Sequence, residues 1–138
     1  MVYVAAAAPL ELVPWREDSP GFYVSELHES EVAVRKQFAA QHVVYVGAHE
    51  GCGCGFQTAK YPEPDPKQLA RCRRSLGAFA TYLADQLRRV PFIELFACWD
   101  GDQSSPPEHR RTLTPHTLNG DGFFFLEKEF SRVESGAV

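Results

Sequence analysis

This sequence of 138 residues has no long apolar run, no excess of positive charge and no paired cysteine motif. A membrane span needs roughly 20 apolar residues in succession, and no stretch approaches that length, so we expect no membrane association. Fourteen basic against 18 acidic residues give a net charge of −4, which argues against a nucleic-acid partner. The apolar residues 1–9 are not preceded by the basic segment of a secretory signal, so we predict a cytoplasmic protein.

Cysteine is scarce, because the chain has four, and none belongs to a C-x-x-C pair. Most structural zinc sites are built from such pairs, so the common zinc-finger arrangements are excluded. In the reducing compartment that we predict, four cysteines are expected as thiols or metal ligands rather than as a disulfide framework.

The composition is that of a folded domain. The chain is 44% apolar and contains 10 Phe, 5 Tyr and 2 Trp, which is far more aromatic surface than a solvated chain carries. Its length suffices for one core, so we expect residues 1–138 to form a single globular domain.

Helix signals are clearest over residues 66–89. Asp65 stands at the N-cap position, Pro66 at the first helical position, and apolar residues then recur on one face. The basic residues of this segment indicate a solvated face. Residues 29–41 also favour a helix, in which Glu31 and Arg35 would form an i, i+4 pair.

Strands are predicted from short apolar runs bounded by turn residues. These runs cover residues 2–8, 22–24, 42–46, 91–98 and 123–133. Residues 127–130 alternate, which suits an edge strand. A brief strand is also expected over 56–60, a loop over 103–110 and one helical turn from Thr114. The predicted fold is α+β or α/β, with a mixed sheet of four to six strands and two main helices packed on it.

The most unusual stretch is residues 42–56, which read HVVYVGAHEGCGCGF. After the apolar run, glycines alternate with functional side chains, namely Gly47, Gly51, Gly53 and Gly55 with His49, Glu50, Cys52 and Cys54. Because glycine adopts positive φ without steric cost, this loop can coil tightly or approach a ligand closely.

Topology suggests what could surround this loop. Strand 43–46, helix 66–89 and strand 91–98 form a strand–helix–strand unit, whose strands we expect to be parallel. The ends of the two strands would then bring all four cysteines, with His49, Asp100 and Asp102, to one edge of the sheet.

A metal site is the first hypothesis for the loop. His49, Cys52 and Cys54 could supply three zinc ligands, and Cys72 or Cys98 could complete a tetrahedral set. The apolar surroundings of Cys72 and Cys98 favour core positions instead. Asp100 and Asp102 are weaker candidates, since Asp-Gly-Asp after a strand is more often only a turn.

Three alternatives for the loop do not involve a metal. A Cys52–Cys54 disulfide would close a very small ring and would be a labile, redox-active bond. The glycines could also be purely structural, with the thiols merely small enough to fit. A phosphate-binding loop is excluded by its pattern, because no Lys-Ser or Lys-Thr follows and proline-rich residues separate it from the next helix.

Two functions therefore remain open, and the sequence identifies neither a reaction nor a catalytic residue. The first is a small protein with a metal or thiol-redox site at residues 47–55, for which zinc is the candidate cofactor. The second is a non-enzymatic binding or accessory protein with a protein partner. A homodimer formed through the apolar residues 123–126 is a further possibility.

Overall fold

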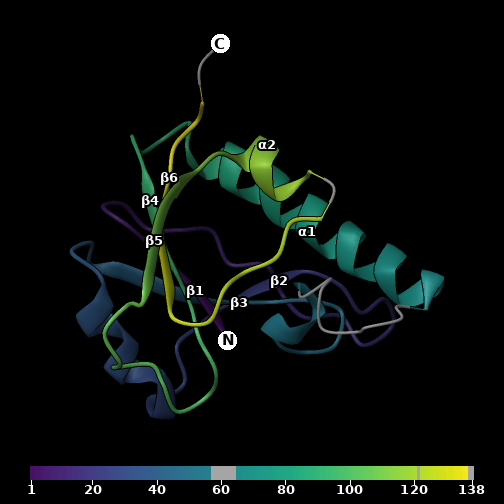
Figure 1. The fold of residues 1–138 in the computed structure, drawn as a ribbon, viewed down its shortest axis with the longest axis horizontal. Helices are drawn as coiled ribbons and strands as arrows, with labels where there is room; N and C mark the ends of the chain where they lie inside the picture. Colours follow the sequence, from purple (N-terminus) through teal and green to yellow (C-terminus); the bar gives the residue numbers. More distant parts are fainter. Residues whose placement is uncertain (57–64, 121, 137–138) are drawn as a thin grey trace.

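A computed structural model describes residues 1–56, 65–120 and 122–136, and these residues form an α+β domain around one mixed sheet, which confirms the predicted fold class. The sheet has six strands in the order β2-β3-β1-β4-β6-β5 (Figure 1). The strands are β1 (Val2–Ala6), β2 (Tyr23–Glu26), β3 (His42–Gly47), β4 (Ile93–Ala97), β5 (His109–Leu113) and β6 (Glu129–Val133). All neighbouring strands are antiparallel except β5 and β6, which are parallel.

Two helical layers cover the sheet, one on each face (Figure 1). Helix α1 (Pro66–Gln86) buries Leu76, Phe79 and Leu83 against one face, beside the short helix α2 (Pro115–Leu118). The 3-10 helix η1 (Glu29–Gln37) places Val34 against the other face, next to Tyr3 and Tyr45. Because strand side chains alternate, each central strand contributes to both cores.

Helix α1 begins as its sequence predicts and ends three residues earlier. The Asp65 side chain accepts a hydrogen bond from the backbone N–H of Lys67, and Pro66 occupies the first position. The backbone N–H groups of Arg88 and Arg89 bond to carbonyls only three residues back, so the last turn tightens after Gln86. Among the described residues, no helix is long and apolar enough to span a membrane.

Residues 29–37 form a 3-10 helix rather than the predicted α-helix. The buried residues Glu31 and Val34 are three positions apart, which is the period of a 3-10 helix. Glu31 does not pair with Arg35. Its carboxylate accepts hydrogen bonds from the Tyr3 hydroxyl (2.7 Å) and from the backbone N–H of His28 (3.0 Å). These two bonds anchor the start of η1 to the sheet.

The C-terminal half contains two further corrections. Residues 109–113 form strand β5, whose first two residues fall within the predicted loop 103–110, and the last strand covers residues 129–133 instead of the predicted 123–133. The last strand lies between β4 and β5 rather than at the edge. Phe123 and Phe125 are buried without forming a strand.

A brief strand was also expected over residues 56–60. Phe56 instead ends the 3-10 turn η2 (Gly53–Phe56), and residues 57–60 lie outside the described residues.

Candidate functional site

The glycine loop and the end of β4 leave the sheet at the same edge. β3 and β4 both pair antiparallel with β1, so they run in the same direction, as the strand–helix–strand pattern predicts. Val2 of β1 lies opposite both Val46 and Ala97, which places the ends of the two strands side by side. The backbones of Met1 and Cys98 are hydrogen-bonded next to them.

The sheet nevertheless separates the cysteines that we expected to gather there. Cys98 shares a face with Phe96 and lies in the core beneath η1, whereas Cys72 is buried on α1, which covers the opposite face. Burial raises the pKa of the Cys98 thiol to about 12. In the described part of the chain, no group of three or more His, Cys, Asp or Glu side chains could hold a metal ion.

Glycines in the loop have clear structural roles. A Cβ atom on Gly47 would lie 2.1 Å from Cε1 of Tyr23, so the ring can pack there only against glycine. Gly51 has φ +79°, and its N–H donates to the carbonyl of Ala48 (2.9 Å) to close a tight turn. The Tyr23 hydroxyl donates to the carbonyl of Gly51 (2.5 Å). Together these contacts support the interpretation of the glycines as structural.

His49 is directed toward helix α1. Its Nδ1 lies 3.0 Å from Oγ of Ser75, a residue that is itself buried. A Cβ on Gly55 would come within 3.0 Å of the imidazole, so this glycine makes room for the ring. Burial raises the pKa of the Tyr23 phenol, and the half-buried Cys52 nearby contributes in the same direction. The side chain of Cys54 lies outside the described residues.

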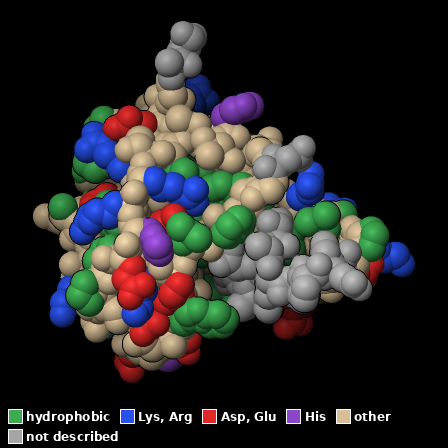
Figure 2. Space-filling model, viewed as in Figure 1, with side chains coloured by type: hydrophobic (Ala, Val, Ile, Leu, Met, Phe, Trp, Pro, Cys, Tyr) green, Lys and Arg blue, Asp and Glu red, His purple; other side chains and the backbone are tan. Residues whose placement is uncertain are grey.

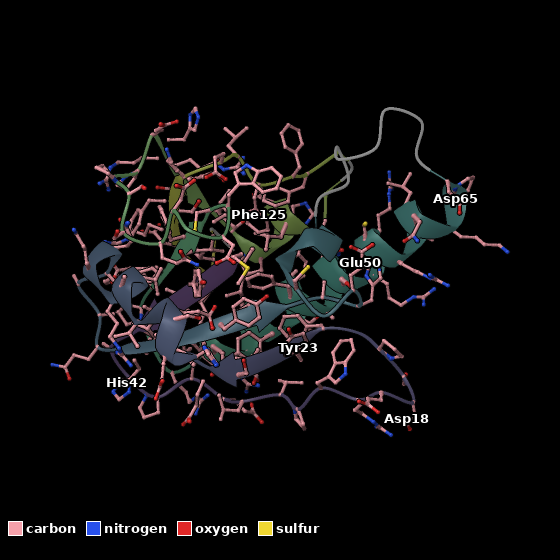
Figure 3. All side chains as sticks on the ribbon, turned by 90° about the horizontal axis from the view of Figure 1, so that it is seen from below. Asp18, Tyr23, His42, Glu50, Asp65 and Phe125 are labelled. Atoms are coloured by element: carbon pink, nitrogen blue, oxygen red, sulfur yellow. The ribbon has the colours of Figure 1, made fainter. Side chains whose placement is uncertain are left out.

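A cleft of about 610 Å³ opens beside His49. One wall is the loop that continues from Asp18 and the other is the N-terminal half of α1, with the loop that carries Glu50 between them (Figure 3). The residues that line it are Ser19, Pro20, Gly21, Phe22, His49, Arg71, Arg74, Ser75 and Ala78.

The charges in this cleft are positive. Arg71 and Arg74 are exposed, and within the described residues neither guanidinium has an ion-pair or hydrogen-bond partner. Burial lowers the pKa of His49, and the two arginines lower it further, while Glu50 and Gln68 act in the opposite direction. The imidazole is therefore neutral at neutral pH. Two cationic groups thus flank a neutral His–Ser pair.

Two polar atoms next to the cleft are shielded from solvent without a hydrogen bond in the described part of the chain. They are Nε2 of His49 and Oε1 of Gln68. Buried polar atoms are normally paired, and exceptions occur at functional sites. Gln68 raises the pKa of His49, so its side chain lies near the imidazole. Neither of the two atoms has a hydrogen bond within the described residues.

Sequence reasoning included His49 but missed its neighbours. We interpreted Arg71 and Arg74 as part of a solvated face, and Ser75 carries no motif. Residues 71, 74, 75 and 78 follow the i, i+3, i+4, i+7 pattern of one helix face, which is the signal that could have grouped them. The sequence does not show that the loop at residues 19–22 lies opposite that face.

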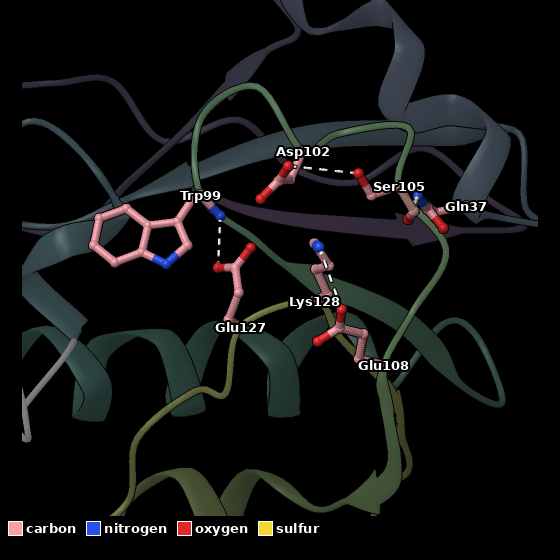
Figure 4. Close-up of polar contacts among 7 residues, drawn as sticks. All are labelled: Gln37, Trp99, Asp102, Ser105, Glu108, Glu127 and Lys128. Carbon is pink, nitrogen blue, oxygen red and sulfur yellow. Dashed lines mark hydrogen bonds and ion pairs between the residues drawn. The ribbon is translucent and has the colours of Figure 1, made fainter.

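Asp100 and Asp102, the weaker metal candidates, organise a turn. Asp100 accepts a hydrogen bond from Nε2 of Gln103 (2.9 Å), and Asp102 lies beside Glu127 (Figure 4). Glu127 accepts a hydrogen bond from the backbone N–H of Trp99 (2.8 Å). Burial, together with Asp102, raises the pKa of Glu127. Acidic side chains gather low on the face of the molecule that Figure 2 shows.

Comparison of the chain with protein-family models, curated proteins and solved structures gives no match.

Proposed function

We propose that this protein binds a small anionic ligand in the cleft between residues 19–22 and helix α1. The observation that carries the proposal is that Arg71 and Arg74, whose guanidinium groups have no partner among the described residues, line the same cleft as the hydrogen-bonded pair His49 and Ser75. An arginine presents a planar set of N–H donors that matches a carboxylate or a phosphate, and such charge-assisted bonds are stronger than neutral ones.

The glycine loop serves this cleft as its support. Gly47 and Gly51 allow the turn at residues 48–51 to pack against Tyr23, and this turn directs His49 toward Ser75. No acidic residue lines the cleft among the described residues. This proposal keeps the binding-protein function expected from the sequence and replaces the protein partner by a small molecule.

Substitution of the two arginines tests the proposal. We expect inorganic phosphate to shift the backbone amide NMR signals of residues 49 and 71–75, and Arg71→Gln and Arg74→Gln each to weaken binding about tenfold. A charge-assisted hydrogen bond contributes about 1.5–3 kcal/mol, which corresponds to tenfold or more.

Arg88→Gln is the matched control for this titration. It removes the same charge from the same helix, and its only ion pair among the described residues is an exposed contact of 3.8 Å with Asp85. Binding should therefore be unchanged. The proposal is abandoned if neither inorganic phosphate nor phenyl phosphate shifts these signals at millimolar concentration.

The competing proposal is a metal or thiol-redox site at Cys52 and Cys54. It draws on two thiols separated by one residue in a glycine-rich loop, with His49 as the third group. What weakens the metal site is that the described residues contain no group of three or more His, Cys, Asp or Glu side chains that could hold an ion.

Elemental analysis of protein purified without a metal-affinity column separates the two proposals. We expect well under one equivalent of zinc or iron, and a Cys52→Ser/Cys54→Ser variant whose melting temperature is nearly unchanged. About one equivalent of zinc, lost in the variant together with stability, would establish a structural metal site instead. Cys98 is the internal control for thiol counting, because it is buried and its raised pKa keeps it unreactive.

A further inference from the structure

The cleft extends beyond its charged groups. The residues that α1 contributes to it, from Arg71 to Ala78, span seven positions, or roughly 10.5 Å of helix. Arg71, Arg74 and Ser75 come first along this face, and Ala78 follows one turn later. The two ends of the cleft therefore differ in chemistry.

The second end is apolar and rigid. Pro20 and Phe22 line the cleft from the loop, and Phe22 lies near Ala78 because its ring packs against the next helix residue, Phe79. The Phe22 ring is held by the core, with its centroid 5.6 Å from that of Phe79 and 5.4 Å from that of Tyr82. Phe22 is nevertheless only half-buried, so part of its surface remains available to a ligand.

The size of the cleft is that of an organic ligand. Its volume of about 610 Å³ lies within the roughly 300–1,000 Å³ of pockets that enclose drug-sized molecules. An inorganic anion at Arg71 and Arg74 would occupy a small part of it and leave the apolar end empty.

We propose that the ligand is an organic phosphate monoester, with its phosphate at Arg71 and Arg74 and an apolar body along Pro20, Phe22 and Ala78. The inference rests on the proposed anion-binding function and adds the class of ligand. The two guanidinium groups match the charge of a phosphate dianion better than that of a single carboxylate.

Phenyl phosphate, benzoate and inorganic phosphate test this inference by the same NMR titration. Phenyl phosphate is expected to bind about tenfold more tightly than inorganic phosphate, because its ring is transferred from water to the apolar end of the cleft. It is also expected to bind more tightly than benzoate. Equal affinities for phenyl phosphate and inorganic phosphate would show that the cleft does not bind an apolar body. Tighter binding of benzoate than of phenyl phosphate would show that the arginines do not select a phosphate.

Ala78→Gln, compared with Ala84→Gln, locates the apolar body. Both alanines are exposed on α1, and only Ala78 lines the cleft. Ala78→Gln should weaken the binding of phenyl phosphate about fivefold and leave the binding of inorganic phosphate unchanged. Ala84→Gln should change neither affinity. An equal loss for both ligands, or no loss, contradicts the proposal. If no anion binds at all, the anion-binding function itself fails, so the two failures are distinguishable.

Discussion

Replacing Arg111 by methionine should lower the free energy of unfolding by about 3 kcal/mol, the lower end of the cost of breaking a buried ion pair, because Glu129 is buried but the Arg111 side chain is 34% exposed. The Glu129 side chain is only 1% exposed, and its Oε1 lies 2.7 Å from the Arg111 guanidinium. The same guanidinium donates to the carbonyl of Phe124 (3.1 Å) and lies over the ring of Phe123. Methionine retains much of the apolar stem but leaves the carboxylate buried without its cation.

Urea denaturation measures this effect, and Arg16→Met provides the control. Arg16 pairs with Asp18 at 3.2 Å, but both side chains are about 70% exposed, so the expected cost is at most about 1 kcal/mol. Adding Glu129→Gln to Arg111→Met should recover part of the lost stability, because no buried charge then remains. A cost for Arg111→Met as small as that for Arg16→Met would show that Glu129 is satisfied without its partner.

Gly47→Ala is expected to cost about 1–3 kcal/mol, the usual range for overpacking, because the half-buried Tyr23 ring can give way in part. The added methyl group would lie within 2.5 Å of three Tyr23 atoms, so the ring must move. Its displacement would break the hydrogen bond to the carbonyl of Gly51 and loosen the turn that positions His49. The same substitution should therefore also weaken anion binding.

Gly21→Ala is the matched control for this second prediction. A Cβ at Gly21 meets only one atom within 4 Å, the carbonyl oxygen of Ser19 at 3.9 Å, so the unfolding free energy should change little. If Gly47→Ala unfolds at the same urea concentration as the wild type, Tyr23 does not need the space above Gly47. The structural role assigned to this glycine would then be wrong.

Local signals predicted the parts of the fold that depend on few neighbours. The cap at Asp65, the apolar stripe of α1 and the run that forms β4 were identifiable because each determines its own structure. Strand β5 was not, because its residues are polar and its stability comes from elsewhere. Arg111 pairs with Glu129, and Arg110 lies over the ring of Phe130, both on the neighbouring strand.

The candidate site was predictable only in part for the same reason. The glycine loop indicated His49, but His49 meets Ser75 from a segment 26 positions away. The apolar surroundings of Cys72 and Cys98 indicated buried positions, and both are buried, but the sequence did not show that Cys98 packs toward η1 and Cys72 on the opposite face with α1. Only the three-dimensional arrangement distinguishes them.

The position of β1 in the middle of the sheet affects how the chain folds. β1 connects the half of the sheet formed by β2 and β3 to the half formed by β4, β5 and β6. The hydrogen bond between Met1 and Cys98 joins residues 97 positions apart. Closing such a long loop costs entropy before any pairing compensates for it, and folding slows as contacts become less local. We therefore expect the two halves of the sheet to form cooperatively, with the pairing of β1 and β4 as the slow step.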